Sequence, residues 1–472
     1  MKELSLTALA KIIKAGDESR ATSHEQRLTG VSTDSRTVQP GDCFFAITGP
    51  NFDGHNFLAD AFAKGASCAV VSKDIAPTQF PDRTVLRVKD TVESLGVLAA
   101  WYRKDCKFKV VAITGSVGKT TTRQIIHHVM SKRFKTFQSP KNFNNFIGLP
   151  LTLLAAEPDC QIVVVELGTN HPGEIEYLSR ITAPDIALVT AVAPAHLEGF
   201  GDLETLTKEK LSISEGLGQA GTLIINGDCP DLVALARKQR KKFLTFGTNP
   251  KCDYHTENLC SDGLSSDFKI AGINIHLPLP GRGNVENALA AWAVCSTLGI
   301  SERDFADAVK TISPVSMRTE MLKLGSLTVI SDCYNANPAS MKNALDILAT
   351  LAKKEKRRAV FVCGDMAELG NHTERLHIEL GQLIAKSNLG LLLTVGHLAL
   401  LAADTARLGV ARRSRAKNAS PLLETHSFAH PAQLCDNLHK LIKDSDIILV
   451  KGSRINKLET VVEKLKAIYP GS

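Results

Sequence analysis

The sequence has few aromatic residues, no closely spaced cysteines and no long apolar segment. Aromatic residues make up 5% of the 472, and the two tryptophans are too few for a platform that stacks nucleic-acid bases. The 11 cysteines are scattered without a Cys-x-x-Cys pair, which argues against a zinc site or a disulfide framework. No apolar segment reaches the ~18 residues of a membrane span, and residues 1–7 lack the apolar core of a signal peptide. We therefore expect a cytoplasmic protein without a membrane span.

A strong excess of one charge is also missing. Lys plus Arg is 56 and Asp plus Glu is 49, which gives a net charge of +7. This excess is too small to indicate a nucleic-acid partner, and it favours a small anionic substrate or cofactor. Basic runs occur at residues 237–242, 353–358 and 412–417. The first two follow predicted helices, and we interpret them as solvated helix ends, where cations favour the helix dipole.

The length corresponds to about three domains, and we place them at residues 1–105, 106–314 and 315–472. The first segment is typical of a small α/β unit with polar turns. In the second, continuous apolar strands alternate with helices, at residues 109–114, 162–166, 186–190 and 222–226. This pattern predicts a parallel sheet covered on both faces. In the third, each of three strands runs into a polar or glycine-bearing loop, at residues 327–332, 359–365 and 447–453, as in doubly wound, Rossmann-like sheets.

A glycine-rich turn joins the predicted strand 109–114 to a predicted helix, with the sequence Gly115, Ser116, Val117, Gly118, Lys119, Thr120 and Thr121. Backbone N–H groups in such a turn approach phosphate oxygens, and the helix N-terminus favours anions. Lys119 is placed to reach the β- and γ-phosphates, and the Thr120 hydroxyl is placed to bind Mg²⁺. The turn departs from the common pattern because Ile113 stands where the first glycine belongs. We predict ATP binding here; the alternative is a tight turn with a solvated lysine.

A carboxylate for the metal is expected beyond this turn. Glu166 ends the apolar strand 162–166, and the carboxyl ends of parallel strands meet at one edge of a sheet. We therefore predict that Glu166 lies near the phosphate turn, although a solvated glutamate at a strand end is the alternative.

Several motifs resemble the Mur ligases, which build the peptide of bacterial cell-wall precursors. In the middle of the chain the matching segments are residues 114–120, 142–150, 166–173 and 195–201. At the two ends they are residues 33–36, 51–55, 332–341, 364–370 and 451–454. The resemblance spans nearly the whole chain. It is strongest to the branch that joins D-alanyl-D-alanine to a UDP-linked tripeptide.

The resemblance implies a division of labour among the domains. The N-terminal domain would bind the UDP-substrate, the central P-loop domain ATP, and the C-terminal Rossmann-like domain the incoming dipeptide. Besides the phosphate turn, ATP would contact Asn287, Arg318 and Asp332. Thr120 and Glu166 would bind one Mg²⁺, and His196 a second; His196 is also a candidate base for the amine.

The resemblance also implies substrate-binding residues. The UDP-substrate residues would be Ser35, Arg36, Asp53, His55, Asn142 and Asn145, and the loop of the third domain would supply Tyr334, Asn335 and Asn337. Three positions depart from the family pattern. Gly283 replaces a histidine common near the adenine site, and Phe143 and Phe146 replace polar or smaller residues in the asparagine-rich loop. His372 and His377 are further candidates, and structural histidines are an equal alternative.

One lysine in the segment 207–213 matches the family lysine that CO₂ converts to a carbamate. We align it with Lys210, with Lys208 as the competitor. Two Mg²⁺ ions and a triphosphate require more oxygen ligands than Glu166 supplies, and a carbamate turns a cation into an anion. The alternative is an ordinary surface lysine on a helix.

The implied activity is an amide ligase that uses ATP to activate the tripeptide carboxylate as an acyl phosphate. Its partners would be UDP-N-acetylmuramoyl-tripeptide and D-alanyl-D-alanine, its catalytic residues Lys119, Lys210 and His196, and we expect a monomer. Three rivals remain: a sister or folylpolyglutamate-type ligase, a P-loop NTPase switch, and a binding protein without activity.

Overall fold

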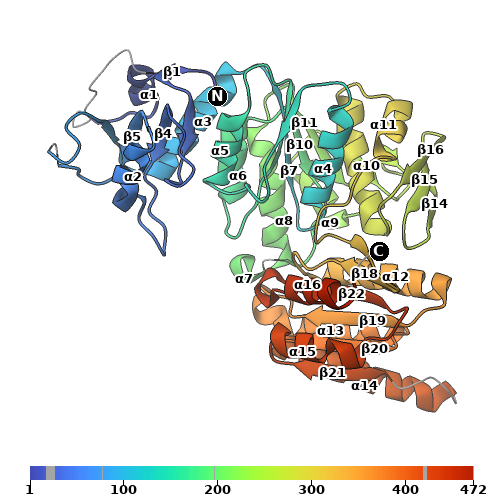
Figure 1. The fold of residues 1–472 in the computed structure, drawn as a ribbon. Coiled ribbons are helices and arrows are strands. Elements are labelled where there is room, and N and C mark those ends of the chain that lie inside the picture. The colour runs from blue at the N-terminus through green and yellow to red at the C-terminus, as the bar shows by residue number, and fades with distance from the viewer. Residues whose placement is uncertain (17–26, 77, 196, 418–422, 471–472) are drawn as a thin grey trace.

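The computed structural model describes residues 1–16, 27–76, 78–195, 197–417 and 423–470. They form three α/β units in chain order, each built on its own sheet (Figure 1). The first and third units both lie against the second (Figure 1). The predicted α/β class with three parts is confirmed. None of the helices in these stretches is long and apolar enough to cross a membrane.

The first unit is a parallel sheet in the order β3-β4-β5-β6. Successive side chains of a strand point to opposite faces, so Phe45 packs in one apolar cluster and Phe44 in another. The elements are β1 (Leu4–Ser5), α1 (Leu6–Ile12), β2 (Arg27–Leu28), β3 (Gly30–Ser32), β4 (Asp42–Phe45), η1 (Gly54–Phe57), α2 (Leu58–Ala63), β5 (Cys68–Val71) and β6 (Thr84–Arg87).

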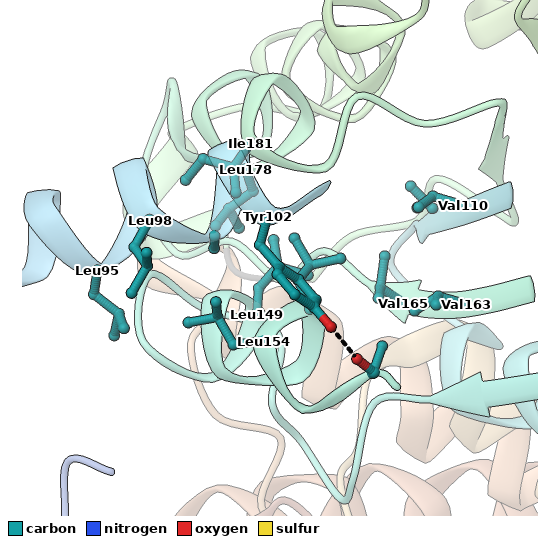
Figure 2. Close-up of a cluster of buried hydrophobic side chains, with 14 of the residues drawn as sticks. Leu95, Leu98, Tyr102, Val110, Leu149, Leu154, Val163, Val165, Leu178 and Ile181 are labelled. Atoms are coloured by element: carbon teal, nitrogen blue, oxygen red, sulfur yellow. Dashed lines mark hydrogen bonds between the residues drawn. The ribbon is translucent and has the colours of Figure 1, made fainter. Parts of the chain in front are cut away.

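Helix α3 (Thr91–Asp105) joins the first unit to the second. The Asp90 carboxylate accepts hydrogen bonds from two backbone N–H groups at its start, which is a favourable N-cap. Leu95, Leu98 and Tyr102 are fully buried against α5 (Gly148–Ala155) and α6 (Glu174–Thr182), as Figure 2 shows. The Tyr102 hydroxyl donates to the Ala156 carbonyl at 2.7 Å. One apolar cluster therefore runs through both units.

The second unit is a parallel sheet in the order β13-β12-β11-β10-β7-β9-β8. Alternate residues of β7, such as Val110 and Val111, enter separate apolar clusters, so the predicted two-sided cover is confirmed. The strands are β7 (Lys109–Thr114), β8 (Thr136–Gln138), β9 (Ile162–Glu166), β10 (Ile186–Val189), β11 (Thr222–Asn226), β12 (Leu244–Gly247) and β13 (Tyr254–His255). The remaining helices are α4 (Lys119–Met130), α7 (Leu197–Phe200), α8 (Leu203–Leu211), η2 (Ser212–Gly216), α9 (Pro230–Lys238), α10 (Arg282–Thr297) and α11 (Glu302–Val309).

The second unit also contains a small antiparallel sheet of β14 (Glu257–Ser261), β15 (Ser266–Ile270) and β16 (Ile273–Leu277).

The third unit is a sheet in the order β17-β18-β22-β19-β20-β21, in which only β17 runs antiparallel among the described strands. The three predicted strands are the neighbours β18, β22 and β19, so their loops meet at one edge. The strands are β17 (Glu320–Leu324), β18 (Leu327–Ser331), β19 (Ala359–Gly364), β20 (Leu391–Val395), β21 (Glu424–Phe428) and β22 (Ile447–Lys451). The helices are α12 (Pro338–Glu355), η3 (Gly370–His372), α13 (Thr373–Lys386), α14 (His397–Lys417), α15 (Pro431–Leu441), η4 (Arg454–Asn456) and α16 (Glu459–Ile468).

Contacts near α7 and at the start of α10 join the second unit to the third. Leu197 of α7 belongs to the core of the third unit, and the Glu198 N–H donates to the Glu368 carbonyl at 3.2 Å. At the start of α10, the Gly283 N–H donates to the Asn343 side chain at 3.0 Å. A Cβ at position 283 would lie 3.2 Å from the Asn343 side chain, so a larger residue there would require Asn343 to shift.

The interpretation of the second basic run as solvated is wrong for its last two residues. The Arg357 guanidinium is bound by carbonyls at Ser326, Ser445 and Asp446. Arg358 pairs with the buried Asp446 carboxylate at 2.7 Å. Because these contacts join β19 to the turn before β22, the two arginines belong to the sheet and not to a free helix end.

Candidate active site

The phosphate turn between β7 and α4 requires its glycines. Gly115 has a φ of +145° and Gly118 a φ of +88°, which L side chains rarely adopt. A Cβ at Gly115 would also lie 2.1 Å from the Thr190 hydroxyl, and one at Gly118 would lie 2.1 Å from the Asn287 side chain. Only glycine both adopts these φ values readily and leaves room for the Thr190 and Asn287 side chains.

The end of β10 holds the turn in place. The Ser116 N–H donates to the Ala191 carbonyl at 2.7 Å, and the Thr190 hydroxyl donates to the Val117 carbonyl at 2.6 Å. The Lys119 ammonium bends back to the Gly115 carbonyl at 2.6 Å. The Ser116 hydroxyl is buried without a hydrogen-bond partner among the described residues. The sequence reasoning missed Thr190, although it ends the strand that the parallel pattern places beside β7.

Glu166 lies at the same edge, as predicted. It ends β9 opposite Ile113 of β7 and is 2% exposed. The Thr120 hydroxyl donates to Glu166 Oε2 at 3.3 Å, and Arg123 Nη1 lies 3.1 Å from Oε1. A hydroxyl and a carboxylate are the hard oxygen donors that Mg²⁺ prefers. These two residues therefore fit a magnesium ion, whereas a solvated glutamate does not describe Glu166.

A larger metal cluster is not found among the described residues, which contain no group of three or more His, Cys, Asp or Glu side chains suited to a metal. The predicted second ligand, His196, lies outside the described residues. Among the described residues, the candidate oxygen ligands for Mg²⁺ are thus Thr120 and Glu166.

Lys210 on α8 is buried, whereas its competitor Lys208 is not. Lys210 is 1% exposed, and Lys208 pairs with Glu204 at the surface. Burial holds the pKa of Lys210 well below its ordinary value of 10.5, and the charge of Lys119 lowers it further. No acceptor for the Lys210 ammonium is found among the described residues. The alternative of an ordinary surface lysine is therefore wrong for Lys210.

Glu209, beside Lys210, fixes the position of α8. Its carboxylate accepts hydrogen bonds from the N–H groups of Gly173 and Ile175, at 2.7 and 2.8 Å, and from the Thr169 hydroxyl at 3.2 Å. This buried carboxylate caps the start of α6, so α8 is tied to the loop that follows Glu166. The sequence reasoning did not single out Glu209.

Cations accumulate around this edge. Burial lowers the pKa of Lys119; Glu166 opposes this shift and the charge of Arg318 adds to it. Arg318 belongs to the third unit, where its guanidinium stacks on the Tyr334 ring with 4.2 Å to the centroid. Because several desolvated cations face few carboxylates, the edge is suited to a multiply charged anion.

Of two further residues predicted to bind ATP, Asn287 lies at the phosphate turn and Asp332 is paired with a lysine of the third unit. Asn287 of α10 accepts from the Thr122 hydroxyl at 3.3 Å and lies beside Gly118, so the structure brings it to the phosphate turn. Asp332, after β18, pairs with the buried Lys451 at 2.7 Å and accepts from the Thr319 N–H at 3.2 Å.

The predicted residues of the first unit are engaged in its own turns. The Arg36 guanidinium donates hydrogen bonds to both oxygens of the Asp34 carboxylate, which lower the pKa of that carboxyl to about 2. The buried His55 donates through Nδ1 to Asp53 at 2.6 Å and accepts from the Ser72 N–H at 3.0 Å. Hydrogen bonds from Lys73 and His55 lower the pKa of Asp53. The neighbouring Ser35 is buried.

The predicted asparagines differ: most are exposed, and several are used to hold the local backbone. Asn142 and Asn145 are exposed, and the Asn145 side chain also accepts from the Ile147 and Gly148 N–H groups. In the third unit, the Asn335 side chain accepts from the Ala336 N–H at 2.9 Å and the residue is exposed. The buried Asn337 instead caps α12 through a capping box with Ser340.

The two candidate histidines of the third unit have structural contacts. His377 is fully buried, donates to the Thr373 carbonyl at 2.7 Å and accepts from the Met366 N–H at 3.0 Å. Burial lowers the pKa of His377. His372 lies 3.3 Å from the Gly201 carbonyl of the second unit.

Three family models match this chain in succession. They are the Mur ligase family catalytic domain at residues 27–103, the Mur ligase middle domain at 113–295 and the Mur ligase glutamate ligase domain at 317–454. A curated relative, UDP-N-acetylmuramoyl-tripeptide--D-alanyl-D-alanine ligase of Bacillus subtilis, is 34% identical over 92% of this chain and 93% of its own length. The chain belongs to the Mur ligase family.

Solved structures agree with this assignment. MurF from Acinetobacter baumannii matches this Mur ligase with a TM-score of 0.88 and 28% identity, over 99% of each chain. MurF from Thermotoga maritima, solved in complex with ADP, matches with a TM-score of 0.79 and 26% identity, over 93% of this chain and 97% of that one. The arrangement of all three units is thus that of MurF structures.

Proposed function

We propose that this Mur ligase joins D-alanyl-D-alanine to UDP-N-acetylmuramoyl-tripeptide, with ATP cleaved to ADP and phosphate, in the synthesis of peptidoglycan precursors. The observation that carries the proposal is the phosphate turn beside Glu166 and the buried Lys210, in a chain whose full-length relatives bear that activity in their names. The ADP in the Thermotoga maritima structure supports ATP as the phosphoryl donor.

The chemistry follows from the poor reactivity of a carboxylate. The terminal carboxylate of the tripeptide attacks the γ-phosphorus in line, the bond to the ADP oxygen breaks, and an acyl phosphate forms. The amine of D-alanyl-D-alanine then attacks the acyl carbon and gives up a proton, for which His196 is the candidate acceptor, and phosphate leaves from the tetrahedral intermediate. Lys119 and the N–H groups of residues 115–120 hold the phosphates and offset the charge that develops.

Magnesium would assist by neutralising phosphate oxygens when bound. Thr120 and Glu166 supply its oxygen donors, and we assign His196 to a second ion. Asn287 contacts the adenine, while Arg318 and Asp332 reach the nucleotide from the third unit.

Lys210 supplies further oxygen donors as a carbamate. With a lowered pKa, its neutral amine attacks the carbon of CO₂, one N–H proton passes to solvent, and an anionic carbamate remains. Burial without a polar partner supports this modification. An unpaired buried ammonium is costly, whereas a carbamate anion would be attracted to the nearby charge of Lys119.

The substrates divide among the units. We place the UDP-substrate at Ser35, Arg36, Asp53 and His55 of residues 1–105 and at the loop with Asn142 and Asn145. We assign residues 106–314 to ATP and residues 315–472, with Tyr334, Asn335 and Asn337, to the dipeptide. The protein would act as a cytoplasmic monomer.

The test is ADP release and product mass with ATP, Mg²⁺ and a UDP-N-acetylmuramoyl-tripeptide that carries lysine or diaminopimelate. We expect the pentapeptide product, and ADP release over many turnovers only when D-alanyl-D-alanine is present. Joining of a single amino acid instead would indicate a sister ligase, and joining of glutamate to folate a folylpolyglutamate-type enzyme. ADP release over many turnovers without any amine would indicate an NTPase, and a complete lack of turnover would overturn the proposal.

A further inference from the structure

Arg123 connects two parts of the site that are distant in the sequence. Its Nη1 lies 3.1 Å from Glu166 Oε1 and donates to the Lys141 carbonyl at 3.0 Å. Glu166 Oε2 in turn accepts from the Thr120 hydroxyl at 3.3 Å. One continuous polar path therefore runs from the phosphate turn, through Glu166 and Arg123, to the loop 139–147.

The loop 139–147 depends on these contacts for its shape. Lys141 has a φ of +47°, a conformation that side chains other than glycine adopt at a cost. Its carbonyl is the one that Arg123 binds. Two further hydrogen bonds join the same loop to β9 and the residues after it: the Gly168 N–H donates to the Asn144 carbonyl at 2.8 Å, and the Glu166 N–H to the Ser139 hydroxyl at 3.4 Å.

The Arg123–Glu166 pair is buried and incomplete. Arg123 is 6% exposed and Glu166 is 2% exposed. Although Arg123 Nη1 lies within ion-pair distance of Glu166 Oε1, neither this oxygen nor Arg123 Nε makes a hydrogen bond among the described residues. Buried charged atoms normally find partners, so the pair retains capacity for further hydrogen bonds or metal contacts.

We propose that Arg123 is a positioning residue that couples the metal-binding oxygens of Thr120 and Glu166 to the loop 139–147. This inference rests on the proposed function, in which that loop holds the UDP-linked substrate. An in-line attack requires the tripeptide carboxylate and the γ-phosphate to be aligned closely. Arg123 fixes the two loops relative to each other through one guanidinium.

Lysine cannot replace arginine in this role. Both residues carry the charge that Glu166 needs, but the lysine ammonium ends one bond short of the position of Nη1 and lacks the planar fork. The contacts with Glu166 and with the Lys141 carbonyl are both made by Nη1, so the shorter side chain of Arg123→Lys loses the hydrogen bond to the Lys141 carbonyl. Its charge still acts on Glu166, because charge attraction falls off less steeply with distance than a hydrogen bond does. Arg123→Met removes both.

The experiment compares these two variants with Lys132→Met, a control that removes an exposed cation from the turn just after the same helix. We measure KM for each substrate, the Mg²⁺ concentration at half-maximal rate, and hydrogen exchange of residues 139–147 with and without Mg²⁺ and ADP. For Arg123→Lys we expect KM for the UDP-tripeptide to rise about 10-fold, as for loss of one charge-assisted hydrogen bond, while KM for D-alanyl-D-alanine and the Mg²⁺ response stay within about 2-fold of wild type. Arg123→Met should also raise the Mg²⁺ requirement, and the control should change none of them.

Hydrogen exchange keeps the inference separate from the proposed function. In the wild type, Mg²⁺ and ADP should protect residues 139–147, and Arg123→Lys should lose that protection while still binding ADP. If the wild type forms no pentapeptide, the proposed function fails. The coupling between the phosphate turn and the loop 139–147 is still tested, because hydrogen exchange does not depend on product formation. Equal rises in both KM values, or unchanged protection in a folded Arg123→Lys, would overturn the role assigned to Arg123.

Discussion

Two lysines of this Mur ligase are equally buried and differently partnered. Lys210 on α8 and Lys451 at the end of β22 are each 1% exposed. The Lys451 ammonium donates to Asp332 Oδ2 at 2.7 Å, to the Asn335 carbonyl at 3.0 Å and to the Asp332 carbonyl at 3.4 Å. These acceptors match the three donors of an ammonium. Lys210 has no such acceptor among the described residues.

The comparison distinguishes Lys451, which has a structural role, from Lys210, whose amine is suited to reaction. Lys451 is compensated within the chain and holds the loop that carries Tyr334, on which Arg318 stacks. Lys210 faces the charge of Lys119 and has a pKa well below 10.5, chiefly through burial. A buried amine in that condition is ready to react or to bind a ligand. Burial alone therefore does not indicate function; the missing partner does.

The largest effect should come from Lys210→Ala. The proposed carbamate would be lost, so we expect the rate of ADP release to fall by about 10³-fold, as when a preorganised electrostatic group is removed from an active site. A short carboxylic acid should restore part of the rate, because it returns an anionic oxygen donor to the space left by the side chain. Full activity of Lys210→Ala would remove the carbamate from the mechanism.

Lys451→Met should act on stability first. Removing one partner of a buried ion pair leaves the other charge uncompensated, which costs about 3 kcal/mol; Asp332 retains some exposure, so we expect about 2 kcal/mol in urea denaturation. The double variant with Asp332→Asn should recover part of this loss, because the unpaired carboxylate is removed. Equal stability of Lys451→Met and wild type would show that the Lys451 contacts contribute little.

The sequence predicted the features that depend on local patterns. Apolar runs located the parallel strands, and the glycine-rich turn located the phosphate site. Strand order then placed Glu166 beside it, because neighbouring parallel strands end at one edge. The burial of Lys210 also had a local signal: on α8 it follows the buried Leu206 by four residues, which puts both on one helix face.

Pairings between distant residues were not predictable in this way. Arg123 and Glu166 are 43 positions apart, and no local pattern indicates that they meet. The same reason explains Arg357 and Arg358, whose basic run resembled a solvated helix end until the sheet brought Asp446 to them. Asn337 lies in a motif shared with the family, yet its side chain caps α12.

A smaller effect should appear in the pH dependence of stability. Lys210 titrates at 10.5 in the unfolded chain and far below this in the folded protein, so between these values the folded state binds fewer protons and stability rises with pH. Lys210→Met removes the buried amine. In CO₂-free buffer we expect its Tm to exceed that of wild type by a few degrees at pH 7, and the difference to shrink as pH approaches 10. A difference independent of pH would mean that the amine is already paired.

The smallest effect should come from Lys208→Ala, two residues away on the exposed face of α8. Its ammonium pairs with Glu204 one helical turn earlier, with 54% of the side chain exposed, and the Glu204 hydrogen bond raises the pKa of Lys208. Exposed pairs of this kind contribute little to folding, so Tm should change by less than about 1 °C and ADP release should match wild type. Because Lys208→Ala and Lys210→Ala remove the same group from one helix, a large loss of activity in Lys208→Ala would move the reactive lysine from 210 to 208.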